Sequence, residues 1–378
     1  MLKIKYIAVH MFNDFSGSPR VLADFCALNC IPSEDLTIIT SNTPGFLGKS
    51  LGRLRLTRYR RSNSTLLNRL MFFLAQCQTF FIVISLCMKS RRAGERVVII
   101  NNTIFCLASM IAGWLMGAFT IVYIHELYSR SSIIKKMLER LVNLMSDKTF
   151  IVSQLLMKSY RLDPQKTFLL PNGLRADFDM QNELDPLAKF SHGTVLFVGS
   201  LKQYKGIEEF MKIAREIPQA EFYASLNCDS EDIENFFANV DLPRNLILRA
   251  RDCNLRQLYQ DAFLVLNLSL PPNCIEGFGL TILEGMSAGC PCVVPKSGGH
   301  MDYFTEGAGF ISDGRDIMSI VKFIQELRAD YDRWRRFSDQ AIKISRQYSA
   351  EVYRKKADEL MAAIVLDCKE RHDQERYL

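Results

Sequence analysis

Two glutamates, Glu276 and Glu284, flank the segment whose residue types are best suited to chemistry. Between them lies a glycine turn at Gly279, followed by a short apolar run that predicts a helix ended by a glycine and a proline. The first amides of such a helix, those of Gly279, Leu280 and Thr281, lack intrahelical acceptors and lie at the positive end of its dipole, which favours a diphosphate. Glu284 could accept hydrogen bonds from ribose hydroxyls, and Glu276 faces the group beyond the phosphates. The segment could thus hold three parts of a nucleotide sugar, although a solvated helix face can carry the same two glutamates.

The same segment resembles a known signature. Its paired glutamates, the embedded Gly-Phe-Gly-Leu and the trailing Glu-Gly-Met-Ser-Ala-Gly-Cys-Pro are similar to the Glu-x7-Glu motif of retaining GT-B glycosyltransferases, glycosyltransferase family 4 (glycosyl transferases group 1). The resemblance covers most of the chain, is strongest between residues 193 and 310, and is weak before Val97. It implies an α/β protein of two doubly wound Rossmann-like domains facing across a cleft. It also implies transfer of a sugar from a nucleotide-diphosphate donor with retention at the anomeric carbon.

A second similar segment, residues 196–206, opens the second half of the chain. Its strand, Gly-Ser-Leu turn and Lys-Gly resemble the family's strand, Gly-Arg-Leu turn and Lys-Gly, so Lys205 matches the lysine that neutralises the developing diphosphate without a metal. Gly199 and Ser200 are expected to line the donor. Ser200 replaces the usual arginine, and Lys202 is a candidate for supplying the missing charge. The alternative for Lys205 is a solvated lysine ahead of a helix.

The turn after the first expected strand could present amides to a phosphate. Gly17 allows a close backbone approach, and Ser18 with Pro19 predicts an N-cap and a first helical residue. The turn resembles the family's Gly-Gly-x-x-Arg loop near the donor diphosphate, with Ser18 in place of the second glycine. An ordinary strand-to-helix turn can have the same composition.

His125 and Glu126 follow an expected buried strand, and active-site residues of parallel sheets gather at such strand ends. His125 matches the family's cleft histidine, which implies a hydrogen bond to the transferred sugar or the leaving phosphate. A structural role is the alternative, and for His10 at the end of the first strand it is the one we favour, beside a minor place in the cleft. The predicted catalytic residues are His125, Glu276 and Lys205. The predicted donor-binding residues are Gly17, Gly199, Ser200, Lys202, Lys205, Phe278, Gly279, Leu280, Thr281 and Glu284.

No metal, and no cofactor beyond the donor substrate, is predicted. Residues 177–179 and 330–332 have the Asp-x-Asp form that often holds a divalent ion in the other major glycosyltransferase fold, but neither ends an apolar strand, so both are interpreted as loop or surface acids. Residues 298–302 resemble the family's Gly-Gly-x-x-Glu motif, with aspartate at the last position. Residues 171–173 resemble its Pro-Asn-Gly turn near the domain junction.

Strands and helices alternate along both halves, which predicts two parallel sheets, each wound on both faces. We expect domains at 1–180 and 190–345, a boundary within Asp177–Gly193, and a charged helix at 346–378 that crosses back to the first domain. The expected strands lie at 4–10, 36–40, 96–101, 120–125, 148–152, 167–170, 194–198, 220–224, 246–249, 263–268 and 291–294. The expected helices lie at 18–30, 65–88, 104–116, 131–145, 206–216, 229–239, 255–261, 280–288 and from 316 onward.

Composition and charge fit a globular two-domain protein with a basic first half. The chain has 378 residues, 48% of them hydrophobic and 23% charged. Residues 1–185 hold 23 basic and 13 acidic residues, a balance of +10, whereas the rest hold 24 and 28, a balance of −4. Residues 36–94 contain ten basic residues and no acidic one. This stretch is expected to meet anionic lipid or a phosphate-bearing acceptor. Nucleic acid is not predicted because no binding module accompanies the charge, and a merely soluble basic face is the alternative.

Eleven cysteines without metal-ligand spacing indicate a reducing compartment. Two stretches, 70–88 and 104–124, approach membrane-spanning length. The second divides into a helix, a turn and a strand, whereas the first fits either an apolar helix packed on a sheet or one lying in the membrane interface. We expect no signal peptide and a cytoplasmic protein, peripheral on the inner face of the membrane.

The sequence therefore predicts a retaining, metal-independent glycosyltransferase of the hexosyltransferase type. Its acceptor is expected to be a saccharide or lipid-linked saccharide in cell-surface polysaccharide assembly, such as lipopolysaccharide. One alternative is a GT-B sugar-nucleotide epimerase or a phosphorylase. The other is a catalytically silent saccharide-binding or scaffold protein, suggested by Ser18, Ser200 and Asp302.

Overall fold

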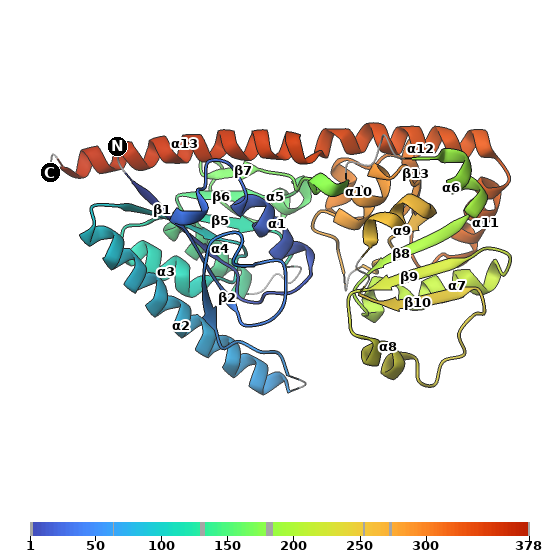
Figure 1. Cartoon of the computed structure of the whole chain (residues 1–378), viewed down its shortest axis with the longest axis horizontal. Coiled ribbons are helices and arrows are strands. Elements are labelled where there is room, and N and C mark those ends of the chain that lie inside the picture. The colour runs from blue at the N-terminus through green and yellow to red at the C-terminus, as the bar shows by residue number, and fades with distance from the viewer. Residues whose placement is uncertain are drawn as a thin grey trace. The chain divides into compact units, whose positions relative to one another are not determined.

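The computed structural model describes residues 3–62, 64–128, 133–178, 184–251, 254–271 and 274–376, with side chains described as far as residue 370. It divides into two compact units. Unit 1 is Met1–Pro171 together with Tyr353–Leu378, and unit 2 is Asn172–Val352 (Figure 1). The first division falls inside the Pro-Asn-Gly turn, and the second falls inside a long helix.

Unit 1 contains a seven-stranded sheet in the order β3-β2-β1-β4-β5-β6-β7, with every described pairing parallel. Its central strands are buried on both faces, which explains their nearly continuous valine and isoleucine content. The strands are β1 (Ile4–Val9), β2 (Leu36–Ser41), β3 (Arg53–Thr57), β4 (Arg96–Asn101), β5 (Phe119–Ile124), β6 (Lys148–Ile151) and β7 (Thr167–Leu169). The helices are α1 (Gly17–Cys26), α2 (Thr65–Arg92), α3 (Leu107–Leu115), α4 (Ile133–Met145), α5 (Gln154–Ser159) and α13 (Ala350–Arg376).

Unit 2 repeats the plan with six strands in the order β10-β9-β8-β11-β12-β13, again with every described pairing parallel. Trp334 lies at the centre of its core, stacked on Phe263 and donating its indole N–H to the Phe263 carbonyl at 2.9 Å. The strands are β8 (Thr194–Gly199), β9 (Phe222–Leu226), β10 (Leu246–Ala250), β11 (Ala262–Leu266), β12 (Cys292–Pro295) and β13 (Gly309–Ser312). The helices are α6 (Pro186–His192), α7 (Ile207–Glu216), α8 (Ser230–Phe237), α9 (Leu255–Asp261), α10 (Leu280–Ser287), α11 (Ile317–Arg328) and α12 (Tyr331–Ser345).

Helix α13 supplies part of the unit 1 core although it follows unit 2 in the sequence. Tyr353, Ala357, Met361 and Ile364 are buried at spacings of three to four residues, the period of one helix face. Outside this face, Asp367 forms an ion pair with Lys148 of β6, with 3.1 Å between Oδ2 and Nζ. Unit 1 is therefore assembled from two distant parts of the chain.

Several elements differ from those that the sequence predicts. Residues 186–192, within the expected boundary segment, form the unexpected helix α6: the Asp185 carboxylate caps the helix, Pro186 lies in its first turn, and Gly193 ends it in the left-handed conformation at φ 62°. Strands β3 and β13 were not expected, because both are short and β3 alternates arginine with leucine, a pattern suited to an edge strand.

The start of α1 and the two Asp-x-Asp triplets have different outcomes. Helix α1 begins at Gly17 with Ser16 as its N-cap residue, so Ser18 and Pro19 lie inside the first turn rather than at its start. Asp330 and Asp332 are exposed, as expected of surface acids, and they lie at the start of α12, where the Asp330 side chain accepts the Arg333 amide as a cap does. The predicted helix start at Ser131, and Asp179 of the other triplet, lie outside the described residues.

Candidate active site

The predicted residues of unit 2 lie near the carboxyl ends of its strands. Strand order reverses between β8 and β11, and in open parallel sheets ligands bind outside such a switch point. Lys205 follows β8, and Glu276 follows β11. The backbone of Glu276 also forms a parallel bridge with Gly298, which follows β12, and its carbonyl accepts the Gly299 amide at 2.7 Å. Three strand ends are thereby joined in one local structure.

Lys205 and Glu276 form an ion pair at this place. Lys205 Nζ donates to Glu276 Oε1 at 2.7 Å, and the two side chains are 24% and 16% exposed. Lys205 ends a short 3₁₀ turn and precedes Gly206, whose positive φ of 87° and close approach leave no room for a side chain, since a Cβ would lie 2.3 Å from the carbonyl oxygen of Leu268, which follows β11. The glycine of the Lys-Gly pair therefore allows the backbone beside Lys205 to pack against the segment after β11.

Glu276 Oε1 takes two further hydrogen bonds, from Ser269 Oγ at 2.7 Å and from Asn267 Nδ2 at 3.3 Å. Burial alone raises the pKa of Glu276, but the Lys205 charge and these hydrogen bonds outweigh it and lower the pKa to about 2. The pKa of Lys205 is lowered by burial and raised more strongly by Glu276, with a net increase. Both groups are charged at neutral pH. All three of these bonds end on Oε1.

The pH dependence of stability tests this pair. A carboxyl whose folded pKa is depressed adds stability above its unfolded pKa, here 4.5, and loses it as the pH falls toward about 2. We expect Glu276→Gln to lower the free energy of unfolding by about 3 kcal/mol at pH 7, and this deficit to shrink progressively below pH 4.5. Urea unfolding of wild type and variant from pH 7 to pH 3 measures it, with the exposed Glu306→Gln as matched control. A deficit that stays constant across this range would contradict the ionic origin.

The N-terminus of α10 lies directly after this pair. Gly279, at φ 87°, is the N-cap residue, and the first amide that bonds back is that of Ile282, to the Gly279 carbonyl at 3.1 Å. The amides of Gly279, Leu280 and Thr281 therefore precede the helical hydrogen-bond ladder and lie at the positive end of its dipole. The Tyr303 hydroxyl fixes the turn by donating to the Gly279 carbonyl at 2.8 Å.

The remaining predicted residues of unit 2 differ in their surroundings. Glu284, one turn into α10, is only 5% exposed, and its Oε2 accepts the Tyr259 hydroxyl at 3.0 Å. Phe278 is buried and packs edge-on to Tyr348 and tilted against Tyr303. Gly199 and Ser200 are half-buried, whereas Lys202 and Asp302 are exposed. Among the predicted residues of this unit, Lys205 and Glu276 are joined by an ion pair.

In unit 1, His125 belongs to a hydrogen-bonded chain after β1, β4 and β5. Its Nε2 lies 2.9 Å from Asn102 Oδ1, and Asn102 Nδ2 lies 3.2 Å from His10 Nδ1. Asn102 Nδ2 also donates to the Ser18 carbonyl at 2.9 Å. The first helical turn that follows Gly17 thus holds the asparagine that contacts His125.

These hydrogen bonds determine which nitrogen of His125 carries the proton. The Ser18 carbonyl can only accept, so the amide nitrogen of Asn102 faces it and Oδ1 faces His125. His125 Nε2 therefore donates, and Nδ1 of the neutral ring is an acceptor. Nδ1 is buried and has no partner among the described residues. Burial, with a smaller contribution from His10, lowers the pKa of His125 to about 3, so the ring is neutral at physiological pH. Burial raises the pKa of the neighbouring Glu126 to about 7.

Asn102→Asp is expected to disturb His125 through its protonation. Aspartate cannot donate to the Ser18 carbonyl, and its carboxylate favours a protonated imidazole, so the pKa of His125 should rise and the fixed tautomer should be lost. We expect turnover to fall about tenfold to a hundredfold, the usual effect of removing a group that orients a histidine. Nitrogen-15 NMR of the imidazoles, assigned with His125→Gln, measures the tautomer. A wild-type His125 that titrates near pH 6.5 would contradict the assignment.

Part of this chain is similar in sequence to known glycosyltransferases. Residues 186–344 match the family model described as glycosyl transferases group 1. The matched segment lies within unit 2 and includes both Lys205 and Glu276. The poly(glycerol-phosphate) alpha-glucosyltransferase of Bacillus subtilis (strain 168) is 26% identical over 227 residues, which are 58% of this chain. The chain spans only 33% of the length of that curated relative.

Solved structures extend the likeness to the whole chain. The crystal structure of Anabaena Alr3699/HepE in complex with UDP and glucose matches with a TM-score of 0.75 and 16% identity, over 95% of this chain and 99% of that one. WaaG, titled a glycosyltransferase involved in lipopolysaccharide biosynthesis, matches with a TM-score of 0.69 and 14% identity, over 94% and 98%. At these identities the likeness concerns the fold, and it confirms the predicted GT-B fold with two Rossmann-like domains.

Three residues around the predicted ones were not foreseen. In unit 2, Asn267 and Ser269 follow β11 and hold Glu276, and in unit 1 Asn102 follows β4 and holds His125. Their positions just after apolar strands are a signal that the sequence does contain, since polar residues at strand ends meet at one edge of a parallel sheet. Within the described ranges, no three His, Cys, Asp or Glu side chains lie close enough together to hold a metal ion.

Proposed function

We propose that this protein is a retaining glycosyltransferase of the hexosyltransferase type, which moves a sugar from a nucleotide-diphosphate donor to a saccharide acceptor. The observation that carries the proposal is the Lys205–Glu276 ion pair beside the amides that begin α10. A diphosphate suits the amides of Gly279, Leu280 and Thr281, and the Lys205 ammonium neutralises the charge that develops on the leaving group. Lys205 and these amides supply the positive charge, so we propose no metal for this step.

We assign the sugar to the carboxylate oxygen of Glu276 that takes none of these three hydrogen bonds. Glu276 Oε1 is held by Lys205, Asn267 and Ser269, whereas Oε2 can accept a sugar hydroxyl and orient the ring. Glu276 thus positions the sugar and does not need to take a proton. For His125 of unit 1 we propose, separately, a hydrogen-bonding role of a neutral ring, because burial lowers its pKa to about 3.

Retention is proposed to proceed on one face of the sugar. The bond from the anomeric carbon to the phosphate oxygen breaks, the bond to the acceptor oxygen forms on the same face, and the departing phosphate oxygen takes the acceptor proton. A double displacement would require a carboxylate nucleophile. Glu276 is poorly suited to that role, because a carboxylate with a pKa of about 2 and three donors on one oxygen is a weak nucleophile.

The acceptor is proposed to be a lipid-linked saccharide in cell-surface polysaccharide assembly, at the inner face of a membrane. The basic first half, with its balance of +10, supports an acceptor that carries phosphate. The names of similar proteins point the same way, since one refers to poly(glycerol-phosphate) and another to lipopolysaccharide biosynthesis.

Thermal shift against a panel of nucleotide sugars tests the donor, because a ligand at a hundred times its Kd adds about 2.7 kcal/mol of stability. The stabilising donor is then incubated with lipid-linked saccharides, and release of nucleoside diphosphate is measured. NMR of the product gives the anomeric configuration. Product with the donor's configuration is expected. An inverted product would refute the one-face step, and a donor that is converted to its epimer without acceptor would refute transfer.

A further inference from the structure

We propose that the outward face of α2, with the cations at both its ends, is a docking surface for an anionic lipid bilayer. The inference goes beyond the proposed sugar transfer, and its tests use neither donor nor acceptor. Helix α2 has 28 residues, and it is the one helix within the described ranges that is long and apolar enough to cross a membrane. Its most apolar window has a mean hydropathy of 2.0, yet only 22% of that window is buried within the protein.

The exposed residues of α2 are apolar where a soluble helix would be polar. Ala75, Thr79, Val83 and Cys87 are buried at four-residue intervals and form the inward stripe. On the opposite side, large apolar side chains between 42% and 78% exposed form an outward stripe: Leu66, Leu70, Leu74, Phe81 and Met88. A helix that is apolar on all sides is normally covered by protein or by lipid. The described part of this chain does not cover the outward stripe.

Both ends of α2 carry cations. Arg58, Arg60 and Arg61 lie in the segment just before it, Arg69 lies in its second turn, Lys89, Arg91 and Arg92 lie at its end, and all seven are exposed. Within the described residues none of the seven forms an ion pair with a carboxylate. A helix with cations at each end and an apolar flank between them fits a position in the plane of a membrane, where both ends meet phosphate headgroups.

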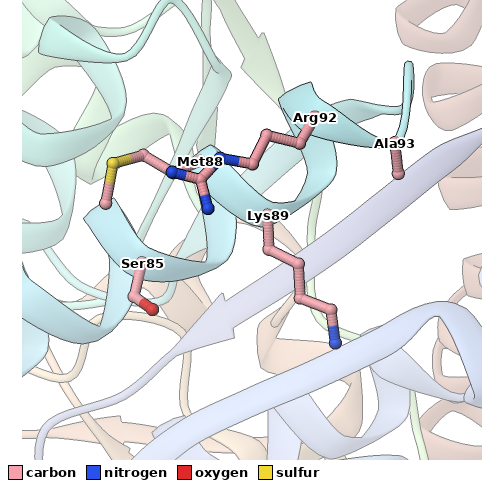
Figure 2. Close-up of a pocket in the computed structure, with 5 residues that line it drawn as sticks. All are labelled: Ser85, Met88, Lys89, Arg92 and Ala93. Carbon is pink, nitrogen blue, oxygen red and sulfur yellow. The ribbon is translucent and has the colours of Figure 1, made fainter.

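A pocket of about 480 Å³ lies at the basic end of α2, lined by Ser85, Met88, Lys89, Arg92 and Ala93. Figure 2 shows Arg92 extending along the helix toward Met88, and Lys89 extending from the same end. The pocket thus places two cations beside the last apolar side chain of the outward stripe. This is the boundary at which a lipid phosphate meets the hydrocarbon region.

Two other occupants fit less well. Spanning the membrane would pull Ala75, Val83 and Cys87 away from the core cluster that they form with Ile7 of β1 and Ile99 of β4. Pairing with a second copy would bring cations against cations, because α2 is basic at both ends and neither a parallel nor an antiparallel arrangement avoids it. The bilayer is the occupant that satisfies both the apolar stripe and the charge.

Vesicle flotation of the full chain tests the surface. We expect binding to phosphatidylcholine vesicles that contain 30% phosphatidylglycerol, and much weaker binding to phosphatidylcholine alone. Lys89→Gln with Arg92→Gln should weaken binding about thirtyfold, from about a factor of five for each cation near an anionic surface. Leu70→Gln, Leu74→Gln and Phe81→Gln together should weaken it at least about a hundredfold.

The matched control combines Leu187→Gln, Met318→Gln and Leu366→Gln, which remove three apolar side chains of similar exposure from other helices. This control should bind vesicles like the wild type, and all variants should keep the wild-type melting temperature. Equal binding by the wild type and the α2 variants would overturn the proposal. So would resistance of the bound protein to alkaline extraction, which indicates a span, or a lipid-free dimer that the Leu70, Leu74 and Phe81 substitutions dissociate.

Discussion

Lys205→Met is expected to lower kcat/KM for sugar transfer by about a hundredfold to a thousandfold, the usual loss when one preorganised group that stabilises developing charge is removed. Lys205 is the cation held beside the α10 N-terminus, and its side chain is only 24% exposed, so water does not replace its charge effectively. The loss should appear mainly in kcat, because the charge on the leaving diphosphate grows as the bond to the sugar breaks. Steady-state assays of nucleoside diphosphate release, with acceptor present, measure both constants.

The matched control for this variant is Lys212→Met on α7. Lys212 is 54% exposed and pairs only loosely with Glu209 at 3.9 Å, so its loss should leave kcat/KM within about twofold of the wild type. Lys205→Arg should restore part of the activity, because it keeps the charge but changes the geometry. A Lys205→Met protein with wild-type kcat would remove this residue from the proposed mechanism.

Glu276→Ala is expected to abolish measurable transfer while leaving the protein folded. The substitution removes the oxygen proposed to orient the sugar, and it also releases Lys205, Asn267 and Ser269 from their shared acceptor. Because positioning and charge placement are lost together, we expect a reduction in kcat of at least about a thousandfold. Circular dichroism and donor-induced thermal shift show whether folding and donor binding survive.

Two further variants make the result for Glu276 specific. Glu276→Gln keeps an oxygen that can accept a hydroxyl, but it removes the charge that holds Lys205, so its activity should lie between those of the wild type and Glu276→Ala. Glu306→Ala, at an exposed position of the same domain, should be fully active. Unaltered turnover by Glu276→Ala would refute the assignment of the sugar to this carboxylate.

The fold could be predicted from local patterns because most of the apolar strands are followed by a helix along the chain. The stretch 104–124 illustrates this: its glycine turn and β-branched end predict a helix and a strand, which are α3 and β5. Prediction was incomplete where a local signal has two meanings. Pro186 and Gly193 were used to place a domain boundary, and they also begin and end the unexpected helix α6, since the same residues are favoured at helix ends.

The sequence predicts individual site residues from their motifs, but it does not predict which of these residues contact each other. The motifs of Lys205 and Glu276 are 71 residues apart in the sequence, and their direct contact follows from the order of strands in the sheet. The tautomer of His125 depends on Asn102 and Ser18, which no motif connects. Such relations arise from packing between distant segments, and a single sequence contains no local signal for them.

The split composition of unit 1 has a consequence for biosynthesis. Its core needs Tyr353, Ala357, Met361 and Ile364 of α13, whereas unit 2 is one uninterrupted stretch from Asn172 to Val352. During translation residues 1–171 emerge first, but their core is completed only when residues 353–378 have been made. Unit 2 can therefore reach its native packing before unit 1. A polypeptide terminated after Pro171 would lack one wall of its hydrophobic interior, and we expect a nascent chain stalled at that point to require chaperones.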